Sequence, residues 1–148
     1  MTPTVHATVV AAPFAEGWRA VMLTGPSGAG KSDLALRLMR AGFRLVADDR
    51  AHVWASGGRL YATAPETLAG RIEARGLGVL KTSIRPMARV RLIVRLTSEP
   101  VERMPDPAFQ TLAGLQIPLV NLDPRPASAV ALVAGALTGF DRDAVWPI

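Results

Sequence analysis

The stretch Gly25-Pro26-Ser27-Gly28-Ala29-Gly30-Lys31-Ser32 decides the fold, because it fits the pattern G-x-x-x-x-G-K-[ST] at every fixed position. Glycines let the backbone curl until successive N–H groups face one centre, and a helix N-terminus behind them adds positive potential. The lysine of this pattern reaches the outer phosphates, and the hydroxyl can hold Mg²⁺. We therefore predict that this stretch binds a nucleotide or another polyphosphate. A glycine-rich turn that binds nothing is the less favoured alternative, since Lys31 and Ser32 are both in place.

The segments on both sides of this loop have the pattern that it requires. Residues 19–24 (RAVMLT) are predicted to form a strand, and residues 31–41 (KSDLALRLMRA) a helix that stops at Gly42. The other segments are predicted as strands at 5–10, 44–47, 90–96 and 116–121, a turn at 13–18, a hairpin of 51–56 with 59–63, a helical turn at 66–71 leading into 72–80, a loop at 100–107 and a helix at 127–137. Because no internal repeat or long linker interrupts them, we expect one mixed α/β domain over residues 1–148.

Length and composition restrict the class of protein. At 148 residues the chain is long enough for one core, and its 49% hydrophobic residues include no uncharged run near the ~18 residues of a membrane span. It has no cysteine, which excludes disulfides and thiolate metal sites. Residues 1–13 lack the basic start and long apolar region of a secretory signal. We expect no membrane association, and an activity on intracellular nucleotide would require a cytoplasmic location.

The charge of the chain is basic and comes almost entirely from arginine. The formal net charge is +5, and 15 of the 17 basic residues are arginines. Arginines can grip phosphates or an acidic partner protein through bidentate geometry. Ordinary surface arginines, favoured by a compositional bias, are the alternative preferred for most positions. With 5% aromatic residues and no basic run, the chain offers few platforms for base stacking, so we expect no nucleic-acid partner.

An adjacent pair of acids, Asp48-Asp49, follows the strand predicted at 44–47. In a parallel sheet, the strand after the helix of a phosphate loop returns the chain to the edge where the loop lies. Phosphoryl transfer needs a second acid to hold metal or to take the acceptor's proton, and adjacent carboxylates can divide these roles. We therefore predict a catalytic role for the pair. A turn with one capping and one solvated aspartate is the alternative.

Several segments spread along the chain together resemble a known family. Besides the phosphate loop, they are LVADDR at 45–50, IEARGLGVL at 72–80, and His6 in the strand before the loop. They resemble HPr kinase/phosphorylase, a bifunctional enzyme that phosphorylates a serine of the phosphocarrier protein HPr and reverses the reaction by phosphorolysis. The resemblance implies an α/β P-loop kinase domain of the HPr kinase/PEP carboxykinase-like type, with a mixed sheet and flanking helices. It also implies ATP and Mg²⁺ as cofactors and an HPr-like phosphocarrier protein as partner.

The resemblance assigns roles to the acids and to the histidine. Asp49 would be the proton acceptor in phosphorylation and the proton donor in the reverse reaction, with Asp48 and His6 as close helpers. From the residues alone, a histidine on an apolar strand is more often structural, so that alternative stays open for His6.

The resemblance also supplies charged partners for the phosphates. Lys31 would stabilise the transferred charge, and Ser32 and Glu73 would be the magnesium ligands. Arg103, in VERMP, resembles an arginine that the family places after the strand corresponding to residues 90–96. There it could neutralise charge on the transferred phosphoryl group. Glu73 and Arg75 are predicted to be alternate residues on a strand, so ordinary cross-strand salt bridges are the alternative for them. For Arg103 the alternative is an ordinary solvated loop residue.

The chain also departs from the family pattern. It resembles the short form of the family, which lacks a separate N-terminal domain. The family's basic Gly-Arg-Asn element, tied to phosphorolysis, is replaced by NLDPRPAS at 121–128, which leaves reverse phosphorolysis open. The family's C-terminal helix, which contributes to partner contact and hexamer packing, is reduced to TGFDRDAVWPI at 138–148. A homo-oligomer, a hexamer by family analogy, is therefore expected from analogy alone.

Two other functions fit parts of the sequence. A small-molecule kinase of the shikimate-kinase type also places acids after the helix of the phosphate loop, but it expects a glycine-rich arginine motif and a lid bearing arginine. RGLG at 75–78 matches that motif poorly, and no lid is evident. A non-catalytic nucleotide-sensing module is the third alternative. The intact lysine, serine and acids argue against it, although fold analogy alone cannot decide function.

Overall fold

Two neighbouring parallel strands, β3 (Gly17–Thr24) and β9 (Met87–Leu96), form the centre of the sheet in the computed structural model, which describes residues 3–139. Alternate residues of β3 point to opposite faces of the sheet, and both faces are buried. Val21 and Leu23 belong to one core cluster, whereas Ala20 and Met22 belong to the other. Burial on both faces explains why this strand has a nearly continuous apolar sequence rather than an alternating one.

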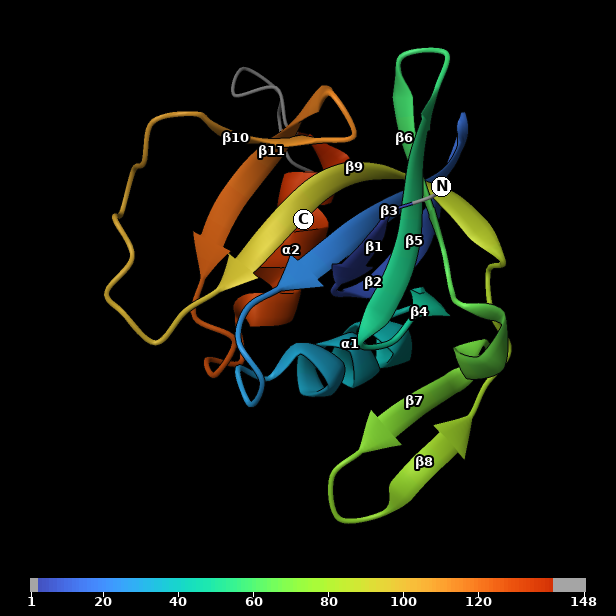
Figure 1. The fold of residues 1–148 in the computed structure, drawn as a ribbon. Coiled ribbons are helices and arrows are strands. Elements are labelled where there is room, and N and C mark those ends of the chain that lie inside the picture. The colour runs from blue at the N-terminus through green and yellow to red at the C-terminus, as the bar shows by residue number, and fades with distance from the viewer. Residues whose placement is uncertain (1–2, 140–148) are drawn as a thin grey trace.

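The strands around this centre form a mixed sheet in the order β1-β5-β6-β9-β3-β2-β4, and β11 also pairs with β9. Their bounds are Thr4–His6 (β1), Thr8–Phe14 (β2), Arg44–Ala47 (β4), Arg50–Ser56 (β5), Arg59–Thr63 (β6), Ala108–Leu112 (β10) and Leu115–Leu122 (β11). β6 pairs with residues 87–89 of β9, and β11 pairs with residues 93–96. The sheet therefore forks along β9 and curls, as Figure 1 shows. This arrangement confirms the predicted mixed α/β class.

The two helices, α1 (Lys31–Arg40) and α2 (Ala129–Thr138), cover one face of the sheet (Figure 1). Leu38 of α1 and Val133 of α2 share a core cluster with Val21 of β3. The cluster on the opposite face contains no helical residue and is closed by the curled sheet, with Leu60 of β6 and Ile117 of β11 among its members. Within residues 3–139, neither helix is long and apolar enough to cross a membrane.

The C-terminus of α1 ends as the sequence predicts, at Gly42. The Gly42 N–H donates to the Met39 carbonyl at 3.2 Å, and the Phe43 N–H donates to the Leu38 carbonyl at 3.1 Å. These two bonds form a Schellman motif, which needs a left-handed residue after the helix, and Gly42 has a φ of 109°. Phe43 and Leu38 then pack in the same core cluster.

We predict that Gly42→Ala destabilises the domain by roughly 1–2 kcal/mol, because an L-residue resists left-handed backbone conformations. A Cβ at this position would meet nothing within 4 Å, so the cost comes from the backbone and not from a clash. Urea unfolding measures the change. Arg40→Ala, at an exposed position in the last turn of α1, is the control and should change stability by less than about 0.5 kcal/mol. Equal stabilities for the two variants would contradict the assignment.

The strand predicted at 5–10 is divided in the structure. β1 pairs with β5, whereas β2 pairs with both β3 and β4, and Ala7 lies between them. The Ala7 N–H donates to the Asp49 carbonyl at 3.0 Å, which holds the chain where it changes partners. The continuous strand was therefore wrong, because an apolar run does not reveal which strand each of its halves joins.

Two other predictions needed correction, and one strand was missed. The turn at 13–18 is shorter, because β2 and β3 pair as far as Phe14 and Gly17. Residues 72–80 form no single strand: β7 (Arg71–Ala74) and β8 (Gly78–Lys81) make a separate hairpin, preceded by the short helix η1 (Glu66–Leu68). Arg75 thus lies in the turn and not on a strand. β10, which pairs with β11, was not predicted.

Candidate active site

The phosphate loop leaves the C-terminal end of β3 and is held against the end of β9. Gly25 has a φ of 145°, and a Cβ added there would lie 3.2 Å from the Leu96 carbonyl oxygen and 3.1 Å from the Ala29 Cβ. Only glycine combines this backbone conformation with so close an approach. The first glycine of the motif therefore fixes the loop to the neighbouring strand.

We predict that Gly25→Ala weakens nucleotide binding and destabilises the domain by about 2 kcal/mol, because the added methyl group would displace the loop from β9. Gly28→Ala is the matched control in the same loop. Gly28 also has a positive φ, 83°, but a Cβ there would meet nothing within 4 Å. Isothermal titration with ATP and urea unfolding should both show the larger loss for Gly25→Ala, and the reverse order would contradict this account.

The loop lysine is held by the loop itself. The Lys31 side chain is 7% exposed overall, and its Nζ donates to the carbonyls of Gly25 at 2.8 Å and of Pro26 at 3.0 Å. Gly30, with a φ of 98°, precedes the first residue of α1. The ammonium group is thus placed over the loop at the positive end of a helix, where phosphate oxygens are attracted.

Asp48 is buried beneath the loop and joins three elements. Its Oδ1 accepts hydrogen bonds from the Thr8 hydroxyl at 2.9 Å and from the Ser32 hydroxyl at 2.7 Å. Its Oδ2 accepts the backbone N–H of Glu73 at 2.9 Å. Asp48 is 8% exposed, and a carboxylate can be buried only when such donors replace water. It therefore connects β2, α1 and β7 while holding the hydroxyl of the phosphate loop.

Asp49 points away from Asp48, into solvent. Its φ of 67° is left-handed, which reverses the direction of the chain between the two side chains. The Asp49 N–H donates to the Thr8 hydroxyl at 3.2 Å, and its Oδ1 lies 2.7 Å from the His6 Nε2. About half of each of these two side chains is exposed. The fold therefore separates the two acids: Asp48 is buried and orients the loop, whereas Asp49 is accessible and pairs with His6.

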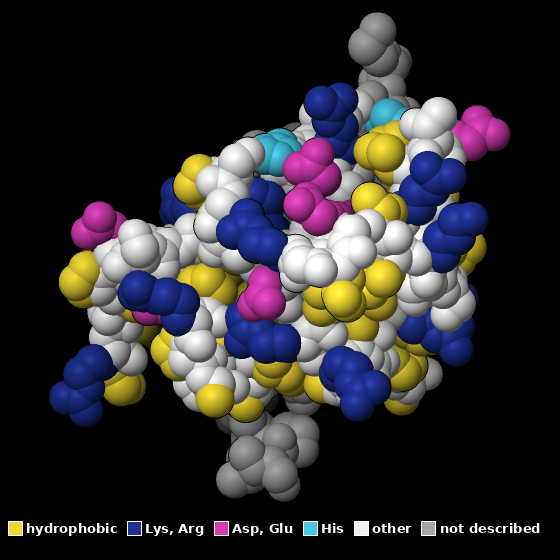
Figure 2. Space-filling view, turned by 90° about the horizontal axis from the view of Figure 1, so that it is seen from below, with side chains coloured by type: hydrophobic (Ala, Val, Ile, Leu, Met, Phe, Trp, Pro, Cys, Tyr) yellow, Lys and Arg dark blue, Asp and Glu magenta, His cyan; other side chains and the backbone are white. Residues whose placement is uncertain are grey.

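The accessible acid faces an open hollow of about 530 Å³ beside the phosphate loop. The hollow is lined by Thr4, Val5, His6, Ser27, Asp49 and Arg50. Figure 2 shows this face of the molecule, with acidic side chains beside a histidine and basic side chains around them. A polyphosphate in the loop and a hydroxyl group brought into the hollow would meet at this carboxylate.

The structure brings most of the predicted site residues together. β4 runs in the same direction as β3, so Asp48 and Asp49 return to the edge of the phosphate loop as expected, but β2 lies between the two strands. Glu73 contributes its backbone N–H, and its side chain is exposed. Within residues 3–139, Arg103 makes no hydrogen bond or ion pair; it lies in the exposed segment after β9.

Two contributors were not predicted from the sequence. Thr8 is completely buried and contacts both aspartates, and its signal was a polar residue within the apolar run VHATVV. Arg50 lines the hollow directly after the acid pair. The sequence did not connect Thr8 with the acid pair, because the two lie about 40 positions apart along the chain.

Comparisons with known proteins show which family this chain is similar to. A family model described as the HPr Serine kinase C-terminal domain matches residues 4–138. HPr kinase/phosphorylase of Xylella fastidiosa (strain M12) is 37% identical over 135 residues, covering 80% of this chain and 42% of that protein. The enzyme of the same name from Limosilactobacillus reuteri (strain DSM 20016) is 37% identical over 130 residues, covering 76% of this chain and 39% of that protein. The chain thus spans about two fifths of the length of these relatives.

A solved structure has the same fold. The HPr(Ser) kinase/phosphatase from Coxiella burnetii matches with a TM-score of 0.75 at 22% sequence identity, covering 88% of this chain and 91% of that chain. This match confirms the predicted architecture of a P-loop kinase domain. The family model covers nearly the whole described chain, including the phosphate loop, the acid pair and the β7–β8 hairpin. The chain belongs to the family of the HPr serine kinase C-terminal domain.

Proposed function

We propose that this domain is an ATP-dependent protein serine kinase that phosphorylates a seryl residue of an HPr-like phosphocarrier protein. The observation that carries the proposal is the accessible Asp49, 2.7 Å from His6, in the hollow that Ser27 of the phosphate loop also lines. A base in this position can reach the hydroxyl of a docked side chain while the loop holds the donor phosphates. Family membership and the names of the relatives support the same activity.

In the proposed reaction, the seryl oxygen attacks the γ-phosphorus of ATP, and the bond from that phosphorus to the bridging oxygen of ADP breaks. The seryl proton moves to the Asp49 carboxylate. His6 orients this carboxylate through Nε2, and an imidazole can then pass the proton to solvent. Lys31 leaves its loop carbonyls to neutralise charge on the outer phosphates. Arg103 is proposed to do the same from the segment after β9, which begins beside Gly25.

The residues present fit the magnesium ion that this chemistry uses. The Ser32 hydroxyl and the Asp48 carboxylate, 2.7 Å apart at the start of α1, are oxygen donors of the kind that Mg²⁺ prefers. When bound, the ion would neutralise phosphate charge. Glu73 is proposed as a further ligand, because its backbone already contacts Asp48 and its exposed side chain is free to turn. No group of three His, Asp or Glu residues is preassembled within residues 3–139, which suits an ion that keeps waters and substrate phosphates as ligands.

The test mixes the protein with labelled ATP, Mg²⁺ and an HPr-like phosphocarrier that carries either its serine or alanine at that position. Label on the serine form alone is the expected result. Transfer to a small molecule in place of the protein would favour the kinase of the shikimate-kinase type. Retained nucleotide binding without any transfer would favour the nucleotide-sensing module.

The kinase direction is proposed as the main activity. The relatives are also named phosphorylases, but residues 121–128 lack the basic element expected for phosphorolysis. Adding inorganic phosphate to the phosphorylated partner should therefore form pyrophosphate and the unmodified seryl residue much more slowly than the kinase reaction forms phosphoserine. Family analogy supports a cytoplasmic homo-oligomer, for which light scattering of the purified protein should give several times the mass of one chain.

A further inference from the structure

A second concentration of charge lies at the opposite ends of the strands that carry the phosphate loop. A pocket of about 260 Å³ is bounded by the first residues of β3 and β9, by the start of β6, by β11 and by the end of α2. The basic residues that line it are Arg19, Arg59, Arg89 and Arg91, and none of its lining residues within 3–139 is acidic. Arg19 is six residues before Gly25 along β3, which places this arginine pocket roughly 20 Å from the phosphate loop.

One of these arginines is already used by the fold. Arg19 donates to Glu16 at 2.6 Å and to the carbonyls of Leu137 and Thr138 at the end of α2, at 2.9 and 3.0 Å. Its guanidinium also lies 4.1 Å from the centroid of the Phe14 ring. Arg19 therefore forms a wall of the pocket and fixes α2 to the sheet.

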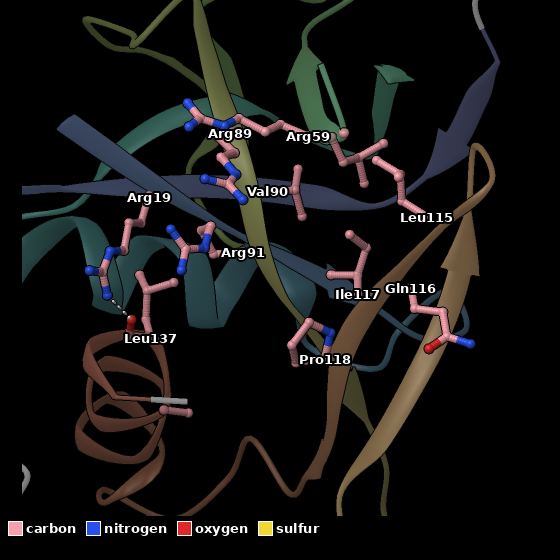
Figure 3. A pocket seen from close by; sticks show the side chains of 13 residues that line it. Arg19, Arg59, Arg89, Val90, Arg91, Leu115, Gln116, Ile117, Pro118 and Leu137 are labelled. Atoms are coloured by element: carbon pink, nitrogen blue, oxygen red, sulfur yellow. Dashed lines mark hydrogen bonds between the residues drawn. The ribbon is translucent and has the colours of Figure 1, made fainter. Parts of the chain in front are cut away.

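The other three arginines have no such partners. The side chains of Arg59, Arg89 and Arg91 make no hydrogen bond or ion pair with any residue between 3 and 139, although their backbones lie in paired strands. Figure 3 shows Arg89 and Arg91 on the same side of β9 as Arg19, with Arg59 reaching toward them. Arg89 and Arg91 are only partly exposed, so water screens their charges incompletely. Burial, followed by repulsion from Arg91 and Arg59, lowers the pKa of Arg89, although arginine stays charged at physiological pH.

A β-bulge contributes to this placement. Ala20 of β3 pairs with Val90, but Val21 pairs with Leu92, so Arg91 is an extra residue in β9. Val90 belongs to the core cluster away from the helices, whereas Leu92 belongs to the cluster beneath them. The bulge therefore lets Leu92 enter the helical side of the core while Arg91 stays at the pocket beside Arg89. Bulges of this kind often redirect a side chain next to a site.

We propose that the arginine pocket binds a small molecule with at least two anionic oxygen groups, phosphate or carboxylate, held by Arg59, Arg89 and Arg91. Guanidinium groups match both kinds of oxyanion through paired N–H donors. The volume lies just below the roughly 300–1,000 Å³ of common ligand pockets, which fits a small ligand and not a protein segment. Val90, Ile117 and Leu137 give the pocket an apolar wall that strengthens charge interactions. The proposal does not depend on the kinase activity proposed above.

The test is isothermal titration with pyrophosphate and, separately, with citrate, in EDTA so that no metal contributes. Two proteins are compared. The first carries Lys31→Ala, which weakens anion binding at the phosphate loop, and the second carries Arg89→Gln and Arg91→Gln in addition. We expect both anions to bind the Lys31→Ala protein, with an affinity that falls as the salt concentration rises. Both should bind at least tenfold more weakly to the protein that also carries Arg89→Gln and Arg91→Gln. A preference between the two anions would show whether phosphate or carboxylate is favoured.

Two controls keep the result interpretable. Arg40→Gln with Arg71→Gln removes the same charge from exposed positions and should leave the affinities within about twofold. The variant with Arg89→Gln and Arg91→Gln should melt at about the same temperature as its parent, because it loses a repulsion between the two arginines and an attraction of Arg91 to Glu16 but no side-chain hydrogen bond. Anion binding that is unaffected by these two glutamines, or absent from the Lys31→Ala protein, would overturn the proposal.

Discussion

Asp49→Asn is expected to reduce phosphoryl transfer to the seryl partner by roughly 100- to 10,000-fold, the usual contribution of a positioned general base. Asparagine has the shape of aspartate, and its carbonyl oxygen can still accept from the His6 ring at the position where Oδ1 now lies. It cannot take the seryl proton. The Asp49 side chain makes no hydrogen bond to the phosphate loop within the described residues, so ATP affinity should change by less than about threefold. Single-turnover transfer rates and nucleotide titration measure the two quantities.

Asp33→Asn is the matched control for this substitution. Asp33 is an exposed acid in the first turn of α1, and its partner is Arg37 at 3.1 Å, so it has no part in the hollow. Its substitution should leave the transfer rate unchanged within about twofold. His6→Ala should give a smaller loss than Asp49→Asn, because it removes the group that orients the base and not the base. Full transfer by the Asp49→Asn protein would refute the assignment of the base.

Asp48→Ala is expected to destabilise the domain by roughly 1–3 kcal/mol. The substitution leaves the buried Thr8 hydroxyl without its acceptor, and an unsatisfied buried donor costs about 1–3 kcal/mol. The Ser32 hydroxyl and the Glu73 N–H also lose their partner, but both are partly exposed and can bond to water. Urea unfolding of the purified protein measures the loss.

Asp48→Asn distinguishes lost hydrogen bonds from lost volume. Its amide oxygen can accept from Thr8 and Ser32, but its NH₂ group would face the Glu73 N–H, donor against donor. We therefore expect an intermediate stability, between the wild type and the alanine variant. Exposed Asp106→Ala should change stability by less than about 0.5 kcal/mol. A similarly small change for Asp48→Ala would show that Asp48 does not connect the three elements.

Local signals in the sequence predicted the parts of the protein that depend on neighbouring residues. The phosphate loop, α1 and its end at Gly42 were all predicted correctly, because their contacts lie within a few positions along the chain. The loop at 100–107 and the strand ending before Asp48 follow from proline and from apolar runs in the same way. Resemblance to a family then predicted the membership that the family model over residues 4–138 confirms, whereas the roles it assigns to single side chains stay predictions.

Contacts between distant segments were decided only by the tertiary structure. Thr8 and Asp48 are 40 positions apart, and His6 and Asp49 are 43 apart, so no local pattern indicates that they meet. The division of residues 5–10 between two strand partners and the left-handed Asp49, which sends the two carboxylates in opposite directions, arise from the same long-range pairing.

The sequence by itself therefore determined the loop and helix that we propose to bind phosphate, because the geometry of this motif is local. Which acid is buried against Ser32 and which is exposed beside His6 was decided by the tertiary structure. The same holds for the arginine pocket, whose residues come from separate strands and from a bulge in β9. The physical reason is that hydrogen-bond partners and burial depend on how strands pair, and strand pairing joins segments that are far apart in the chain.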